Sequence, residues 1–311
     1  MSTKHLLDPS LHPLLELAPA FHFSLDNLQQ FRGRGLAAAV LGDSEAHGVR
    51  RESIVISSQD YDIPCLLYVP MQTKARAGYL HIHGGGYIAG SVEGADATNT
   101  RIAAELGVVV LTVGYRLAPE HPVPAPLDYC YAALGWLHQQ ADTLGIDRQR
   151  IAIGGESAGG GLAAALAIHA RDLGEFAICH QHLTYPMLDD RTGTEASPGD
   201  PLVGEFVWNR HCNEFGWSCY LGDMPARGPF VPARVDSVEG LPPTWMFTVG
   251  LDLFRDENIA YAQRLMAAGI ATELVVLPKA CHAFQWVPDS PLSKRYIHDH
   301  LQALGKALNT A

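Results

Sequence analysis

The stretch RIAIGGESAGGGLAAALAIHARDL, residues 150–173, places Ser157 between a short apolar run and a long alanine-rich one. The run before the serine is typical of a buried strand, and the run after it is typical of a helix. A serine on a sharp turn between a strand and a helix projects its hydroxyl above the sheet, where it can act as a nucleophile. Gly155 and Gly159 lie two positions away on either side, so no Cβ atom crowds the turn. The stretch therefore predicts a strand, a nucleophile turn and a helix, with an ordinary glycine-rich helix start as the alternative.

Short apolar runs alternate with helical patterns along most of the chain. The predicted strands are 53–57, 65–69, 79–83, 108–113, 151–153, 177–183, 245–249 and 273–277, and the predicted helices are 95–106, 126–144, 158–173, 256–268 and 292–308. This alternation predicts an α/β fold, with a mostly parallel sheet between two layers of helices. No helix is expected between the first two strands, so they are expected to form a hairpin at one edge.

Two segments depart from this rhythm. Residues 1–45 have leucines and phenylalanines at helical spacing, which predicts amphipathic helices. Residues 187–232 form a long insertion, first polar and then rich in aromatic side chains. We expect both to form a small helical cap over the strand ends, with an extra helix buried against the core as the alternative for the insertion. The catalytic domain then consists of 46–186 and 233–311.

Composition excludes several classes of protein. The 311 residues include 22 Lys and Arg against 33 Asp and Glu, for a net charge of −11, and the pI is near 5.7. This balance argues against nucleic acid or an anionic membrane as a partner. No apolar run reaches the roughly 20 residues of a membrane span, and no secretory signal is visible, so we expect no membrane insertion and a cytoplasmic location. The six scattered cysteines are typical of reduced, buried thiols, and a homo-oligomer is compatible with these features.

A second glycine motif supports the nucleophile turn. His83-Gly84-Gly85-Gly86 follows a predicted strand, and consecutive glycines let backbone N–H groups approach a ligand oxygen. In the arrangement that pairs such a loop with a GxSxG turn, the residue after the nucleophile supplies a further N–H, and here that residue is Ala158. A flexible turn or a phosphate-binding loop is the alternative.

A serine nucleophile needs a general base and an acid that orients it, in the chain order serine, acid, histidine. Among the later histidines, His282 lies in a loop at the C-terminal end of the predicted strand 273–277, which is where a base is expected. Asp252 follows the strand 245–249 and is the preferred acid. Asp256 is the rival, and its place early in a helix suits a structural role.

Taken together, residues 78–311 resemble the hormone-sensitive-lipase-like bacterial esterases of the α/β-hydrolase superfamily. The resemblance rests on His83 to Tyr87, Tyr115 to Ala125, Gly155 to Gly160, Asp252 with Arg255 to Glu257, and His282 to Phe284. It implies a Ser157, Asp252, His282 triad and an oxyanion hole built from Gly85, Gly86 and Ala158, with Gly84 completing the loop. It also implies a helical cap.

Three positions depart from the family pattern: Glu156 where Asp is usual, Leu253 where Pro is common, and Ala283 where Gly is common. None of them removes a reacting group. We expect Glu156 to brace the loop through a hydrogen bond or an ion pair, and not to react.

Other polar features receive structural interpretations. Arg116 and Glu120 can pair locally. Asp189 and Asp190 are expected to cap or solvate a loop, and His180 and His182 to be satisfied within a strand, so no metal is expected.

These features predict a serine carboxylic-ester hydrolase that acts on small-molecule esters with short to medium acyl chains, through an acyl-enzyme and without a cofactor. An amide hydrolase on the same fold is the alternative, and a non-catalytic small-molecule receptor is a further one.

Overall fold

The computed structural model describes residues 2–18, 21–34, 41–58, 61–72 and 77–309. Its centre is an eight-stranded sheet in the order β1-β2-β4-β3-β5-β6-β7-β8. The strands are β1 (Val49–Ser57), β2 (Asp62–Pro70), β3 (Gly78–Ile82), β4 (Val109–Val113), β5 (Ile151–Glu156), β6 (His180–Thr184), β7 (Thr244–Val249) and β8 (Thr272–Leu277). β2 pairs antiparallel with β1 and β4, and all other pairs are parallel. The predicted α/β class and the edge hairpin are confirmed.

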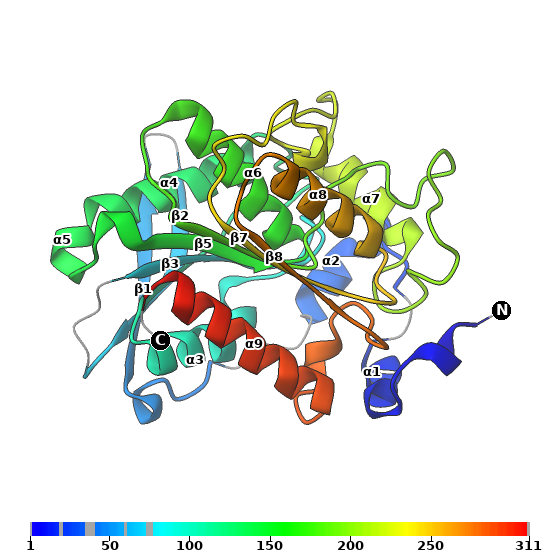
Figure 1. The fold of residues 1–311 in the computed structure, drawn as a ribbon, viewed down its shortest axis with the longest axis horizontal. Coiled ribbons are helices and arrows are strands. Elements are labelled where there is room, and N and C mark those ends of the chain that lie inside the picture. The colour runs from blue at the N-terminus through cyan, green and yellow to red at the C-terminus, as the bar shows by residue number, and fades with distance from the viewer. Residues whose placement is uncertain (1, 19–20, 35–40, 59–60, 73–76, 310–311) are drawn as a thin grey trace.

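Helices cover both faces of the sheet (Figure 1). α4, α6 and α8 lie on one face, and α3 and α9 lie on the other. Their bounds are α3 (Asp96–Leu106), α4 (Ala125–Gln139), α5 (Ala141–Leu144), α6 (Ala158–Leu173), α8 (Arg255–Ala267) and α9 (Pro291–Ala307). The single helix predicted over 126–144 is wrong in one respect, because the chain breaks into α4 and α5 at Gln140.

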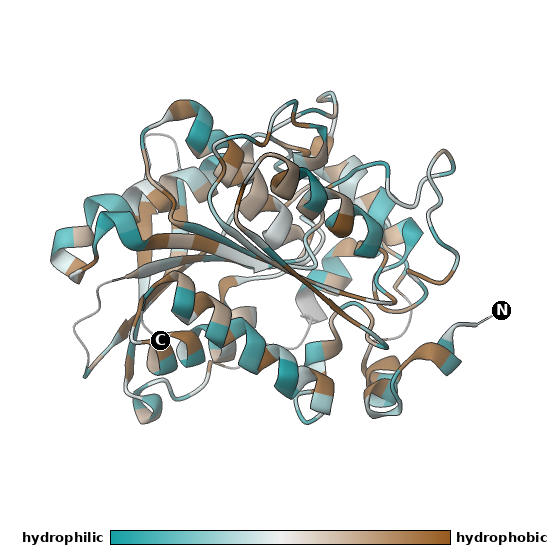
Figure 2. Ribbon diagram, viewed as in Figure 1, coloured by the Kyte–Doolittle hydropathy of each residue, from teal (hydrophilic) through white to brown (hydrophobic). Residues whose placement is uncertain are grey.

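Burial follows from the sequence of each helix. α6 is almost entirely buried from Ala158 to Ala170, because small and aliphatic side chains let it lie close against the sheet. α9 carries both hydrophilic and hydrophobic residues, as expected of a helix with one face on the sheet and the other in solvent (Figure 2). Within the described part of the chain, no helix has the length and apolar character needed to cross a bilayer.

The two segments expected to form a cap lie against each other. The N-terminal segment contains α1 (His12–Leu17) and α2 (Leu25–Arg34), and the insertion contains α7 (Arg210–Leu221). Asn209 Nδ2 donates to the Phe21 carbonyl at 2.9 Å, and the rings of His22 and His211 stack at 3.8 Å. Much of both segments is loop and not the helix that was predicted, and 19–20 and 35–40 lie outside the described residues.

The parallel strands bring distant loops to one edge of the sheet. The segments after β3, β5, β7 and β8 all leave from carboxyl ends of neighbouring parallel strands. Clefts at such strand ends are where ligands bind in α/β folds. His83, Ser157, Asp252 and His282 all lie in these segments.

Candidate active site

Ser157 lies on a strained turn between β5 and α6. Its backbone is at φ 56° and ψ −122°, a conformation that residues other than glycine rarely adopt. The turn packs so closely on β3 that a Cβ atom at Gly155 would lie 2.1 Å from the Ile82 carbonyl oxygen, and one at Gly159 would lie 2.0 Å from it. The two glycines are therefore required by the approach of the turn to the neighbouring strand.

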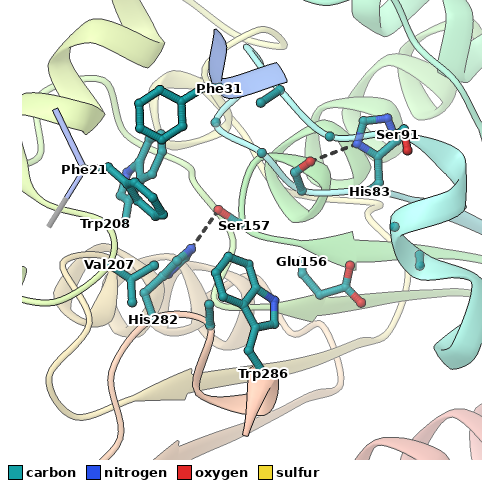
Figure 3. A pocket seen from close by; sticks show the side chains of 18 of the residues that line it. Phe21, Phe31, His83, Ser91, Glu156, Ser157, Val207, Trp208, His282 and Trp286 are labelled. Carbon is teal, nitrogen blue, oxygen red and sulfur yellow. Dashed lines mark hydrogen bonds between the residues drawn. The ribbon is translucent and has the colours of Figure 1, made fainter. Parts of the chain in front are cut away.

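Three side chains from different strand ends meet at this turn. His282 Nε2 lies 3.0 Å from Ser157 Oγ (Figure 3), and His282 Nδ1 lies 2.7 Å from Asp252 Oδ2. With Nδ1–H donating to the carboxylate, Nε2 is free to accept the serine proton. Asp252 Oδ1 accepts from the Phe254 amide at 3.0 Å, which holds the buried carboxylate in place. The structure thus brings together the three residues predicted as a triad.

The rival acid lies elsewhere. Asp256 is paired with Arg255 at 2.7 Å, and 53% of its side chain is exposed. Its place in the first turn of α8 fits the structural role expected of it.

The glycine loop after β3 leaves its backbone donors free. Among the described residues, the amides of Gly84, Gly85 and Gly86 have no hydrogen-bond acceptor. Gly85 has φ +122°, and a Cβ atom there would lie 2.2 Å from the Ala89 carbonyl oxygen. Ala158 begins α6, so its amide has no acceptor within the helix. These are the donors predicted for an oxyanion hole.

His83 fixes the start of this loop. Its Nδ1–H donates to the Gly84 carbonyl at 2.9 Å, its ring stacks on Tyr115 at 4.3 Å, and the Tyr115 hydroxyl donates to the His83 carbonyl at 3.0 Å. Burial lowers the pKa of His83 to about 4, so the ring is neutral at pH 7. Sequence reasoning identified the motif but not the stacking on Tyr115, which depends on a partner 32 positions away.

A cavity of about 560 Å³ opens beside Ser157. Phe21, Phe31 and Trp208 line one side of it (Figure 3). Of the aromatic residues in the insertion 187–232, Trp208 lines the cavity, whereas Trp217 and Tyr220 pack on Tyr87 instead. The N-terminal phenylalanines and Trp286 were not predicted as lining residues, because nothing local in the sequence distinguishes them from core positions.

Comparison with known proteins agrees with the fold described above. A protein family described as having the α/β hydrolase fold matches residues 79–286. The chain belongs to this family. The α/β hydrolase is 32% identical to esterase LipI of Mycobacterium tuberculosis over 87% of this chain and 85% of the relative. It is also 32% identical to carboxylesterase NlhH of the same species, over 89% and 88% of the two chains.

A solved structure is similar over almost the whole chain. The structure titled bacterial heroin esterase superposes with a TM-score of 0.90 and 35% identity, covering 99% of both chains. The resemblance to hormone-sensitive-lipase-like bacterial esterases is therefore confirmed for this α/β hydrolase.

Arg32 ties α2 of the hydrolase to the loop after Gly84 to Gly86 and to the segment after β4. Its guanidinium donates to the Ile88 and Ala118 carbonyls, each at 2.7 Å, and pairs with Glu120 at 2.7 Å. This pairing lowers the pKa of Glu120 to about 2. The predicted local pair of Arg116 with Glu120 is wrong. Glu120 pairs instead with Arg32, from a distant part of the chain. Arg116 lies over the Tyr129 ring at 5.3 Å.

The remaining polar features of the hydrolase have protein partners. Glu156 contacts His81 at 3.0 Å, as expected of a brace. Asp190 pairs with Arg234 at 2.5 Å, and Asp189 pairs with Arg191 at 2.7 Å. His182 and His300 share a hydrogen bond of 2.9 Å. The six cysteines are free thiols, and all but Cys179 are buried.

Proposed function

We propose that this α/β hydrolase is a serine carboxylic-ester hydrolase with Ser157 as nucleophile, His282 as general base and Asp252 as the acid that orients it. The observation that carries the proposal is the chain of contacts from Asp252 through His282 to Ser157, at 2.7 and 3.0 Å, beside unpartnered glycine amides. The similarity to proteins named esterase and carboxylesterase supports the same reaction class.

Acylation follows from this arrangement. Ser157 Oγ attacks the ester carbonyl carbon while its proton passes to His282 Nε2. Asp252 stabilises the imidazolium and keeps Nδ1 protonated, without taking the proton itself. The tetrahedral intermediate then loses the alcohol, which takes the proton from His282, and the acyl group stays on Ser157.

Deacylation reverses these roles with water. His282 removes a proton from water as its oxygen attacks the acyl-enzyme, and the same proton returns to Ser157 Oγ when the carboxylic acid leaves. In both steps the negative oxygen is expected to accept hydrogen bonds from the amides of Gly85, Gly86 and Ala158, with Gly84 shaping the loop.

The oxyanion role of the loop is tested by Gly85→Ala. A Cβ atom would clash with the Ala89 carbonyl oxygen, a backbone atom, and the residue would be strained at φ +122°. The loop must shift, and we expect kcat to fall about 100–1,000-fold, as when one such donor is lost. Gly42→Ala is the matched control, because its Cβ atom would make only an ordinary contact at 3.6 Å. Steady-state kinetics on an aryl acetate measure the effect, and a Gly85→Ala enzyme with normal kcat would contradict the role.

The division of the chain into a cap and a catalytic domain is also part of the proposal. Residues 1–45 and 187–232 are inferred to form a cap over a catalytic domain of 46–186 and 233–311. Phe21 and Phe31 from the first segment and Trp208 from the second line the same cavity, which supports this division.

The substrate class follows from the cavity. Its volume of about 560 Å³ falls in the usual range of small-molecule sites, and aromatic side chains close one side. For a series of p-nitrophenyl esters we expect kcat/KM to be highest between acetate and hexanoate and to be at least roughly tenfold lower for palmitate. Trp208→Ala should move the maximum to longer chains, because it removes a wall of the cavity. A kcat/KM that keeps rising up to palmitate would argue against a closed acyl site.

Ester and amide hydrolysis are separated by a matched pair of substrates. We expect p-nitrophenyl acetate to be hydrolysed with a kcat/KM several orders of magnitude above that of p-nitroacetanilide. Equal values would favour an amide hydrolase instead.

A further inference from the structure

The peptide group between Gly85 and Gly86 is held through its carbonyl. The Gly85 carbonyl accepts from the amides of Ile88 and Ala89, at 3.1 and 2.9 Å. A trans peptide group is planar, so its C=O and the N–H of the next residue point in opposite directions. Because the Gly85 carbonyl faces Ile88 and Ala89, the Gly86 N–H points away from them. The direction of this proposed oxyanion donor therefore depends on the turn at 85–89.

Arg32 holds the turn from its other side. Arg32 Nε donates to the Ile88 carbonyl at 2.7 Å. This carbonyl and the Ala89 N–H belong to one peptide group, so Arg32 and the Gly85 carbonyl hold it from opposite sides. A continuous series of hydrogen bonds and planar peptide groups thus leads from Arg32 to the Gly86 N–H.

The same guanidinium has two further contacts. Arg32 Nη2 donates to the Ala118 carbonyl at 2.7 Å, and the Ala118 amide donates to the Tyr87 carbonyl at 3.0 Å. Glu120 accepts from both terminal nitrogens of Arg32, at 2.7 and 2.9 Å. Only 18% of the Arg32 side chain is exposed. An arginine that served only as the ion-pair partner of Glu120 would need neither carbonyl contact.

Arg32 reaches this turn from a distant part of the chain. It belongs to α2 in the N-terminal segment, directly after Phe31, which lines the cavity (Figure 3). The turn that it holds follows β3 of the central sheet. The orientation of the Gly86 N–H is thus tied to the packing of α2.

We propose that Arg32 is a positioning residue for the oxyanion hole, which aims the Gly86 N–H at the substrate oxygen by holding the turn at 85–89 while α2 is docked. The inference rests on the proposed ester hydrolysis and adds a residue to the same site. A donor that is out of line weakens binding of the transition state more than that of the substrate, because the oxygen becomes negative only as the reaction proceeds.

Arg32→Met tests the proposal, since it removes the donors and keeps an unbranched side chain. We expect kcat on p-nitrophenyl acetate to fall about 10–100-fold, less than when a donor is lost outright. Arg264→Met in α8 is the matched control. Arg264 also donates to two carbonyls, those of Ala233 and Val235, each at 2.6 Å. None of these three is among the described residues that line the cavity, so kcat should change by less than about twofold.

A short trifluoromethyl ketone and the corresponding alcohol separate positioning from a general loss of cap structure. Ser157 Oγ attacks the ketone carbon and its proton passes to His282, which leaves a hemiketal with a negative oxygen, whereas the alcohol binds without reaction. In Arg32→Met the inhibition constant of the ketone should rise by the factor by which kcat/KM falls, and that of the alcohol should stay unchanged. Equal weakening of both inhibitors, or no weakening of the ketone, would overturn the proposal and leave Arg32 as an anchor of α2 only.

Arg32→Lys provides the test if Arg32→Met does not fold. Lysine keeps the positive charge beside Glu120, but one ammonium group lacks the planar fork that spans the Ile88 and Ala118 carbonyls. We expect the ketone to bind at least about threefold more weakly, with the alcohol unaffected. Wild-type inhibition constants for both would overturn the proposal. A failure of the proposed ester hydrolysis is distinguishable, because wild-type enzyme would then bind the ketone no more tightly than the alcohol, and the inference would fall with it.

Discussion

Ser157→Ala is expected to lower kcat by about five to six orders of magnitude while the protein stays folded. The hydroxyl oxygen lies 3.0 Å from His282 Nε2 and is the atom proposed to attack the substrate, so its removal leaves no route to an acyl-enzyme. Any residual rate would come from binding and from the glycine amides. Steady-state kinetics on p-nitrophenyl acetate measure the loss, with thermal unfolding as a check on the fold.

The cooperation of the two residues gives a sharper version of the same test. His282→Ala should cost about as much as Ser157→Ala, and the double variant should be no worse than either one, because the residues act as a unit. Ser57→Ala on β1, at the far edge of the sheet, is the control. Stoichiometric labelling of Ser157 by an organophosphonate should be lost in Ser157→Ala. Additive losses, or near-normal turnover in either single variant, would remove the assignment.

Asp252→Asn is the second large effect, with an expected loss in kcat of about ten-thousandfold. Asp252 Oδ1 accepts from the Phe254 amide, and Oδ2 faces His282 Nδ1. If the asparagine keeps its oxygen on the Phe254 amide, its NH2 group faces Nδ1 and forces that nitrogen to accept. The proton then lies on Nε2, which cannot take the proton of Ser157.

Asp256→Asn serves as the matched control for this change. Its carboxylate is half-exposed and paired with Arg255, so kcat should change by less than about twofold. Kinetics of the two variants side by side decide between the candidate acids. A severe loss in Asp256→Asn together with a mild one in Asp252→Asn would reverse the assignment.

Local patterns were sufficient for the strands and for most helices that flank the sheet, and for choosing the candidate reacting residues. Ser157 is recognisable because a serine on a tight strand-to-helix turn needs small residues at Gly155 and Gly159, and this requirement is written within five consecutive positions. Asp252 and His282 could be chosen because parallel strands send their following loops to one edge.

Partner choice among charged side chains could not be predicted in the same way. Glu120 was expected to pair with Arg116, four positions away, yet its partner is Arg32, 88 positions away in α2. Local spacing says only which pairs are near in the chain. The tertiary packing of α2 brings Arg32 to Glu120.

The sequence alone determined an α/β sheet with a serine turn, a glycine loop and a histidine at strand ends along one edge, because each depends on short-range backbone geometry and strand order. Only the tertiary structure decided that Phe21, Trp208 and Trp286 line one cavity, and that Glu156 contacts His81. The reason is physical: the environment of a side chain, and hence its net charge and exposure, is set by neighbours that the fold brings from far along the chain.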